Sequence, residues 1–211
     1  MTKHLFTSTS ATDLPQREAY QILAATVVPR PIALVSTVSP TGAPNLAPFS
    51  FFQIGGSNPP SVVFSPTSAR EGAEKDTLAN IRGTGEFVIN LVTLDIAKQM
   101  NETSANLPPG ESEWNKTCFS PLDSHLVKPS RVAESPIHFE CKLHQIVPHG
   151  TGPGSANYVI GEIVMFHIAN SLQKDGVLNT ENLEIVGRLG GEWYIEISHP
   201  QRFTMTRPTA R

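Results

Sequence analysis

Two stretches of the sequence carry residues that could bind a flat, phosphorylated ligand. The first is Lys75-Asp76-Thr77, which opens a predicted helix with Asp76 or Thr77 as its cap and Gly83 or Gly85 at its end. A helix N-terminus offers unpaired N–H groups and a positive dipole end, which suit a phosphate, while Lys75 adds a charge and Thr77 a donor. An ordinary capped helix explains the same residues, so the pattern alone leaves both interpretations open.

The second stretch runs from Asn45 to Phe52 and follows a strand predicted over 32–39 and a turn that contains Gly42. Pro44 and Pro48 prevent it from being a fully hydrogen-bonded central strand. Backbone N–H and C=O groups released from the ladder could meet a flat polar ligand beside Ser50-Phe51-Phe52. The alternative is an edge strand that its prolines protect from pairing.

Two further features of the sequence could carry chemistry. His138, Glu140 and His144 share one face of a strand predicted over 137–147, but two histidines six residues apart on a strand lie roughly 20 Å apart. We therefore predict no metal site and expect this face to be solvated or to form part of an interface. Trp114, in a long polar loop over 103–121, either covers a ligand or fills a gap in the loop.

Several catalytic motifs are missing from the sequence, which contains no GxSxG and no HExxH. The glycine-rich run over 149–156 precedes a predicted strand, not the helix that a dinucleotide fingerprint requires, so we interpret it as a hairpin loop. Cys118 and Cys141 form no CxxC and are expected to be free thiols in a reducing cytosol.

Composition limits the classes of protein to which the chain can belong. Its 211 residues suffice for one large or two small domains. The net charge of −3 and pI near 6.2 give no footprint for nucleic acid. We find no apolar run long enough to cross a membrane and no signal peptide, so we expect a cytoplasmic protein.

The elements that must position these residues are mostly strands. Eighteen prolines and fifteen glycines indicate many turns. About seven strands at hairpin spacing, with two or three short helices, predict a mainly β fold, a closed or partly open antiparallel barrel.

Taken together, the order of these segments resembles the flavin reductase-like family, whose fold is the FMN-binding split barrel, a Greek-key antiparallel β-barrel, and most of all its flavoredoxin-type branch. The match extends from about residue 19 to residue 197, which implies one FMN-binding domain over 1–211 with a polar N-terminal arm and a C-terminal tail. The matching segments are PRPIALVST at 29–37, NLAPFSFF at 45–52, PPSVVFS at 59–65, KDTLANI at 75–81, EFVINL at 86–91, ESPIHFEC at 134–141, GEIVMFHI at 161–168 and RLGGEWY at 188–194.

The resemblance implies a set of flavin-binding residues. Lys75, Asp76 and Thr77 would hold the phosphate end. Arg30 would reach a flavin oxygen or phosphate, or else form a surface ion pair. The isoalloxazine would be surrounded, largely through backbone, by Asn45, Leu46, Ala47, Pro48, Ser50, Phe51 and Phe52.

Three residues outside this set are placed by the resemblance at the edges of the site. His167 would border the nicotinamide pocket, or else be a buried, hydrogen-bonded core histidine. Arg188 and Tyr194 resemble the family's C-terminal motif and would complete the site across the interface of a homodimer.

The function implied by the resemblance is an FMN-dependent oxidoreductase that moves hydride from NAD(P)H to flavin or to a small acceptor. FMN is expected over FAD, and no protein group is needed as a catalytic base because the cofactor supplies the chemistry. The alternatives are a nitro- or quinone-reducing enzyme, and an electron carrier that passes electrons to a redox partner. A binding module without flavin is the third, against which the intact KDT and NLAPFSFF segments argue.

Overall fold

The main element of the computed structural model, which describes residues 5–68, 74–108, 111–198 and 203–208, is a seven-stranded sheet in which every neighbouring pair is antiparallel. Three β-hairpins contribute most of the strands of this sheet, in agreement with the turns predicted from the sequence. In spatial order the strands are β3 (Pro44–Phe49), β2 (Ala33–Val38), β6 (Glu86–Leu91), β9 (Ile137–His149), β10 (Ala156–Ile168), β5 (Pro60–Phe64) and β4 (Phe52–Ser57).

The two edge strands of this sheet, β3 and β4, are consecutive in the chain. Only Ser50 and Phe51 separate them, and three residue steps span at most about 11 Å. The sheet must therefore curl until its two edges approach each other, although β3 and β4 are not paired. This confirms the predicted split barrel, and we call the unpaired boundary between β3 and β4 the split.

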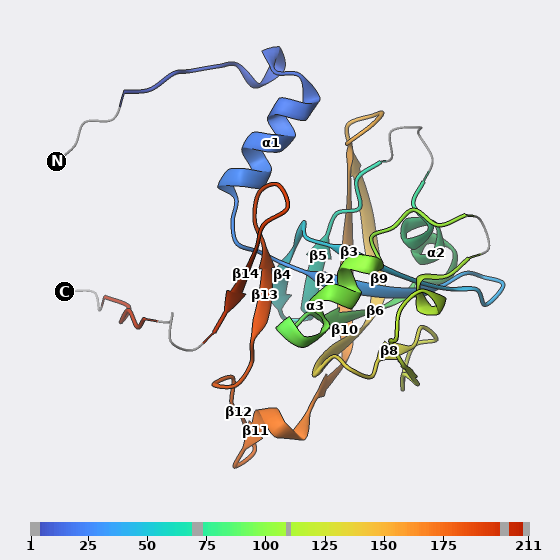
Figure 1. Cartoon of the computed structure of the whole chain (residues 1–211). Helices are drawn as coiled ribbons and strands as arrows, with labels where there is room; N and C mark the ends of the chain where they lie inside the picture. Colours follow the sequence, from blue (N-terminus) through green and yellow to red (C-terminus); the bar gives the residue numbers. More distant parts are fainter. Residues whose placement is uncertain (1–4, 69–73, 109–110, 199–202, 209–211) are drawn as a thin grey trace.

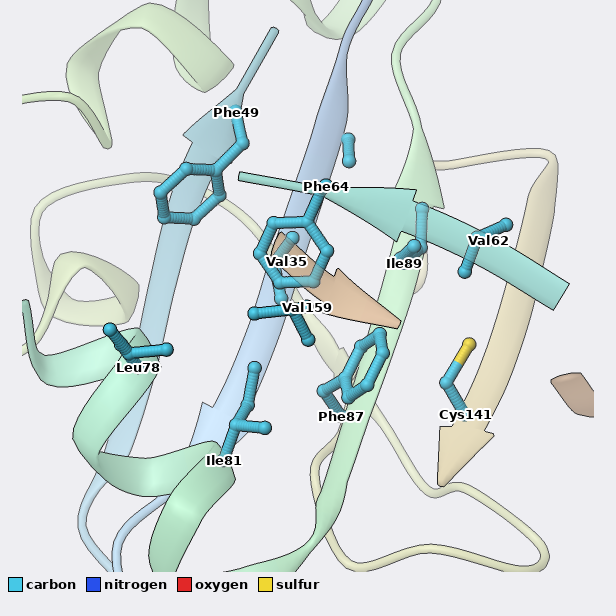
Figure 2. Close-up of a cluster of buried hydrophobic side chains, with 11 residues drawn as sticks. Val35, Phe49, Val62, Phe64, Leu78, Ile81, Phe87, Ile89, Cys141 and Val159 are labelled. Atoms are coloured by element: carbon cyan, nitrogen blue, oxygen red, sulfur yellow. The ribbon is translucent and has the colours of Figure 1, made fainter. Parts of the chain in front are cut away.

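The interior of the barrel is filled by side chains from alternate positions of the strands (Figure 2). Phe64 packs against Phe49 and Phe87, with ring centroids 5.3 and 5.5 Å apart. Helix α2 (Asp76–Thr84) contributes Leu78 and Ile81 to the same cluster. Burial of this apolar surface holds α2 against β2 and β3.

A second apolar cluster lies on the outer face of β2 and β3. Leu34 and Leu46 point to this side, whereas their neighbours Val35 and Ala47 face the barrel interior. The elements that follow β6 include η2 (Leu94–Ile96), α3 (Ala97–Glu102), η3 (Glu113–Asn115), β7 (Pro121–Leu122) and β8 (Arg131–Val132). Met100, Phe119 and Val132 bring them into this outer cluster.

Smaller elements complete the described chain. A three-stranded sheet contains β1 (Arg30–Pro31), β13 (Ile185–Arg188) and β14 (Tyr194–Ile197), in that order. Helix α1 (Gln16–Thr26), after η1 (Ala11–Asp13), buries only Ala24 and extends away from the barrel in Figure 1. The remaining elements are η4 (Asn170–Leu172), β11 (Gln173–Lys174) and β12 (Val177–Leu178).

Within the described ranges, none of the helices is long and apolar enough to cross a membrane. Cys118 and Cys141 are both free, as predicted.

The prediction for one face of β9 was wrong. Lys142 and His144 on β9 are exposed, but His138 and Glu140, expected to lie with them on a solvated or interface face, are 5% and 0% exposed. The segment before β9 folds back over this face, and the N–H groups of His125 and Leu126 donate to the Glu140 carboxylate at 2.7 and 2.6 Å. The predicted alternation of side chains between the two faces of the strand was correct. The sequence of the strand does not indicate, however, that a segment from elsewhere in the chain will cover one of these faces.

Candidate functional site

The start of α2 presents backbone donors that the helix itself does not use. Lys75 occupies the N-cap position, so the predicted cap at Asp76 or Thr77 was one or two residues late. The N–H groups of Leu78 and Ala79 donate to the Lys75 carbonyl, and no side chain caps the helix. In the part of the chain that the structure describes, the N–H groups of Asp76 and Thr77 therefore make no hydrogen bond.

A buried network of polar side chains fixes this helix start against β2 and β3. The Asn45 amide donates to the hydroxyls of Thr37 and Thr77 at 3.2 and 3.0 Å, and the Asn80 amide donates to Thr37 at 3.0 Å. All four residues are buried. Since the Thr77 oxygen only accepts here, its O–H hydrogen remains available to a ligand.

The Lys75 ammonium lies 5.4 Å from the centre of the Phe49 ring. Lys75 as a residue is exposed, yet partial burial of its amino group lowers its pKa. No carboxylate among the described residues lies within ion-pair distance of it. A cation without a counter-ion beside free helix N–H groups is the donor set that a phosphate requires.

The turn formed by Ser50 and Phe51, here called the Ser50 turn, lies at the split. Nε of Arg30 donates to the Ser50 hydroxyl at 3.3 Å, and the Arg30 guanidinium lies 5.9 Å from the Phe51 ring centre. The Phe51 carbonyl accepts from the Ser65 N–H at 2.8 Å. The Ser65 hydroxyl is buried and has no partner within the described residues, an unsatisfied group that a ligand at this turn would satisfy.

Arg30 does not form a surface ion pair, which was one of the two predictions for this residue. It is 6% exposed, and it donates to the carbonyls of Ala24, Val27 and Leu189 at 2.7, 3.1 and 3.0 Å. Burial lowers the pKa of Arg30, Tyr20 opposes this effect and the neighbouring Arg188 adds to it. Arg30 thus ties the end of α1 and the β13–β14 loop to the Ser50 turn.

Arg188 and Tyr194 lie side by side with Arg30 in the three-stranded sheet of β1, β13 and β14. Arg188 pairs in register with Arg30 on one side and with Tyr194 on the other. Its guanidinium lies 4.3 Å from the Tyr194 ring centre and donates to the Gly191 carbonyl at 2.6 Å. Tyr194 in turn donates its hydroxyl to Asn101 at 3.1 Å. Two arginines therefore meet near the Ser50 turn, and neither has a carboxylate partner in the described ranges.

The backbone of β3 has fewer unpaired N–H and C=O groups than the ligand-binding interpretation of this stretch predicted. Asn45 to Phe49 lie on an edge strand, and Pro44 and Pro48 occupy positions that share the outward orientation of Leu46. The Leu46 N–H donates to the Glu113 carboxylate at 3.0 Å. Glu113 was missed because it lies 67 residues away in an irregular segment. Between Asn45 and Phe52, Ser50 and Phe51 are the residues that lie outside the strands.

Trp114 and His167 are not brought to this set of residues. Trp114 packs in the outer cluster with Leu46, across β3 from Phe49 and Lys75, which agrees with the gap-filling interpretation. His167 hydrogen-bonds Glu140 at 2.6 Å with its side chain 13% exposed, as a core histidine would. It lies eight residues, roughly 26 Å, along β10 from Val159, which pairs with Phe64 beside the Ser50 turn.

The site therefore has two ends along one strand. The start of α2 offers N–H groups, an ammonium and a hydroxyl, and the Ser50 turn offers a hydroxyl without a partner beside aromatic and guanidinium groups. Phe49 lies between them. Such an arrangement fits an elongated ligand with a phosphate at one end and a flat polar ring at the other.

Comparisons with known proteins find similarity over most of the chain. The family described as Flavin reductase like domain matches residues 25–184. A solved structure of nitrilotriacetate monooxygenase component B from Bacillus cereus is 32% identical, with a TM-score of 0.89, covering 96% of this chain and 100% of its own.

Two further solved structures are similar over almost the whole chain. The 2-nitrobenzoate 2-nitroreductase NbaA from Pseudomonas fluorescens is 30% identical, with a TM-score of 0.85, covering 96% of this chain and 97% of its own. A protein with a split barrel domain from Shewanella frigidimarina is 26% identical, with a TM-score of 0.77, covering 92% and 96%.

Proposed function

Because the chain belongs to the flavin reductase-like family, which implies flavin binding, we propose that it binds FMN and transfers hydride from NADH or NADPH to flavin or to a small acceptor. The observation that carries this proposal is the two-ended site along β3. The donors that suit a phosphate and the surface that suits a flat ring come from separate parts of the sequence. In the fold they lie on either side of Phe49.

At the phosphate end, the N–H groups of Asp76 and Thr77, the Lys75 ammonium and the Thr77 hydroxyl would bind the phosphate of FMN. The buried network around Asn45 holds α2 in place before the ligand arrives. This preorganisation lowers the entropic cost of binding. FMN rather than FAD is proposed because the motifs resemble those of the FMN-binding branch.

At the ring end, the Ser50 turn and Phe52 would lie against the isoalloxazine, with the Ser65 hydroxyl as an additional hydrogen-bonding group. A bound flavin supplies the hydride and electron chemistry. Arg30 would act mainly by fixing Ser50, and the positive charges of Arg30 and Arg188 would favour negative charge near the turn. Asn45, Leu46, Ala47 and Pro48 would then serve as the rigid strand that carries the turn.

We also propose that two copies of the chain associate. Helix α1 buries only Ala24, whereas Tyr20 and Leu23 on the same side of the helix and Val27 at its C-cap are 55%, 56% and 60% exposed. An apolar face of this kind favours a partner surface. The two free cysteines accord with a cytoplasmic location, which is likewise part of the proposal.

Reduction of a nitroaromatic compound through bound FMN is the second candidate function, and the similarity to a 2-nitrobenzoate nitroreductase favours it. Similarity to component B of nitrilotriacetate monooxygenase favours a flavin reductase that works as one component of a larger enzyme system. Steady-state oxidation of NADH and NADPH, measured with free FMN and then with nitroaromatic or quinone acceptors, separates the two. Fast turnover with excess FMN supports the flavin reductase, and turnover that needs a nitroaromatic acceptor supports the nitroreductase.

An electron carrier would give a third result. Neither nucleotide would reduce the bound flavin efficiently, whereas dithionite or a redox partner would do so quickly. That outcome would contradict the proposed hydride transfer while leaving flavin binding intact.

A further inference from the structure

The outer edge of β14 carries backbone groups that no strand of the described chain pairs. β14 is the last strand of the three-stranded sheet, and among the described strands it pairs with β13 alone. The Val186 N–H donates to the Val92 carbonyl, so Val186 faces away from its register partner Glu196. In an antiparallel ladder the N–H and C=O groups of Glu196 must then point outward, and those of Tyr194, two residues earlier, do the same. This edge is therefore open to another strand.

One face of this open edge is apolar and exposed. Ile195 and Ile197 lie on the same face of β14 and are 37% and 36% exposed, and Trp193, just before the strand, is 75% exposed. A Cβ at Gly187 would lie 3.0 Å from Cβ of Pro29 and 3.3 Å from Cγ2 of Ile195. The apolar face of β14 thus continues to the chain that leaves α1, whose exposed side chains already favour a second copy.

The residues over 203–208, here called the C-terminal segment, have the pattern of a strand without a partner. Phe203 and Met205 are 82% and 84% exposed, and they alternate with Thr204 and Thr206. Aromatic residues and threonine favour strands. Within the described ranges this segment makes no hydrogen bond, ion pair or ring contact, and it lies away from the barrel in Figure 1. Its apolar row and its free backbone are what the open edge of β14 lacks.

Charge favours the same pairing. Residues 198–211 contain three arginines and neither Asp nor Glu. β14 and the turn before it contribute Glu192 and Glu196, while the guanidinium of Arg188 is already occupied with the Tyr194 ring. A negative charge on an edge strand discourages pairing with an identical edge but attracts a basic strand.

We propose that two copies of the chain exchange their C-terminal segments, so that the segment of one copy adds as a strand to the open edge of β14 in the other. Phe203 and Met205 would then extend the apolar row of Ile195 and Ile197, since burial of one face sets the register of a strand. Backbone hydrogen bonds supply the affinity, as in other cases of strand addition.

The occupant is a second copy because each C-terminal segment lies away from its own β14 edge, which leaves that edge for the partner. Both surfaces are used twice in such an exchange, which gives a closed two-fold dimer. The exchange does not require flavin. It adds a second contact to the association proposed for α1.

Disulfide cross-linking of the full-length chain tests the pairing directly. Every protein carries Cys118→Ser, which removes the exposed thiol. A protein with Met205→Cys is mixed with one that carries Ile195→Cys or Ile197→Cys, which covers the two registers that keep the apolar row together, and is then oxidised. The exchange predicts a covalent dimer in which position 205 of one copy is linked to position 195 or 197 of the other.

A matched control and a double variant decide between the possible outcomes. Ile54→Cys, at an 83% exposed position of β4, should link to position 205 at least about fivefold less, because a disulfide needs Cβ atoms held close together. Equal linkage to β4 and to β14 would overturn the exchange. A chain that carries both Ile195→Cys and Met205→Cys should give a covalent dimer. An internally linked monomer would show instead that the segment closes on its own edge, which also contradicts the proposal.

Sedimentation equilibrium measures what the contact contributes to association. Phe203→Ser combined with Met205→Ser should raise the dissociation constant of the dimer at least about tenfold, because apolar side chains of both copies lose their burial. Thr204→Ser combined with Thr206→Ser, in the other row, is the control and should leave the constant unchanged. Equal constants for the two double variants, or a monomeric wild type, would refute the exchange. FMN binding should be the same in all these proteins, so the exchange and the proposed flavin function can fail separately.

Discussion

At the scale of single residues, Lys75 is the group on which the phosphate assignment depends most. We expect Lys75→Ala to weaken FMN binding about tenfold, because it removes an ammonium without a counter-ion next to free helix N–H groups. Titration of flavin fluorescence measures the dissociation constant. Lys142→Ala, on the exposed face of β9, is the matched control and should leave binding unchanged. Equal FMN affinity in both variants would remove Lys75 from the site.

His138 predicts how stability depends on pH. The pKa of its ring is about 4 in the folded protein, against 6.5 as the ordinary value, so only the unfolded chain gains the proton between these two values. The free energy of unfolding must therefore fall as pH decreases through this window, by about 2 kcal/mol between about pH 7 and pH 4.5. Glu140, whose pKa is lowered from its ordinary value of 4.5, adds a loss of its own that begins as the pH approaches that value and grows below it.

The measurement is urea unfolding of the wild-type protein and of His138→Gln at both pH values. The variant keeps a donor for the Val132 carbonyl but cannot be protonated, so its loss of stability on acidification should be smaller than that of the wild type. Parallel losses in the two proteins would mean that the folded-state pKa of His138 is not depressed.

At the scale of elements, the close packing of β10 against β6 depends on a glycine. A Cβ at Gly161 would lie 2.3 Å from Cζ of Phe87, a ring held in the barrel core between several neighbours. We expect Gly161→Ala to lower the free energy of unfolding by about 1–3 kcal/mol, since an overpacked core must shift. Gly56→Ala on β4, where the nearest atom would be 3.8 Å away, is the control. Thermal unfolding compares the two, and equal stability would show that the core yields without cost.

The elements were largely predictable from the sequence because their signals are local. Gly42, with φ of +91°, lies in the turn between β2 and β3 as expected, and Gly85, with φ of +70°, ends α2. The hairpin at 149–156 lies where the glycine-rich run indicated. The contacts that complete the candidate site were not predictable in this way. Glu113 reaches Leu46 across 67 residues, and Arg30 reaches Leu189 across 159, so no local pattern reports either pair.

Buried polar groups were the other systematic difference between sequence and structure. His138 and Glu140 have the alternation of a solvated face, yet a segment from elsewhere covers them. Arg30 was expected to be free for a ligand or for an ion pair, and it is buried among carbonyls. The identity of a polar residue predicts that it will find partners, but it does not predict which ones.

At the scale of the whole molecule, the exposed apolar face of α1 predicts association of two copies. We expect Leu23→Glu to shift the protein toward the monomer, because a charge would replace apolar surface at the interface. Gln21→Glu makes the same change in charge at an exposed polar position of α1 and should leave the assembly intact. Size-exclusion chromatography with light scattering gives the mass. A wild-type protein that is monomeric at high concentration would contradict the proposed dimer.

The central claim, that the split of this barrel holds FMN and lets a nicotinamide nucleotide reduce it, is tested most directly by a visible absorption spectrum. The purified protein, loaded with FMN, is recorded before and after anaerobic addition of NADH and, separately, of NADPH. The account predicts a yellow protein that bleaches promptly with at least one nucleotide. A protein that stays colourless after FMN and FAD are added and the free flavin is removed would contradict the account.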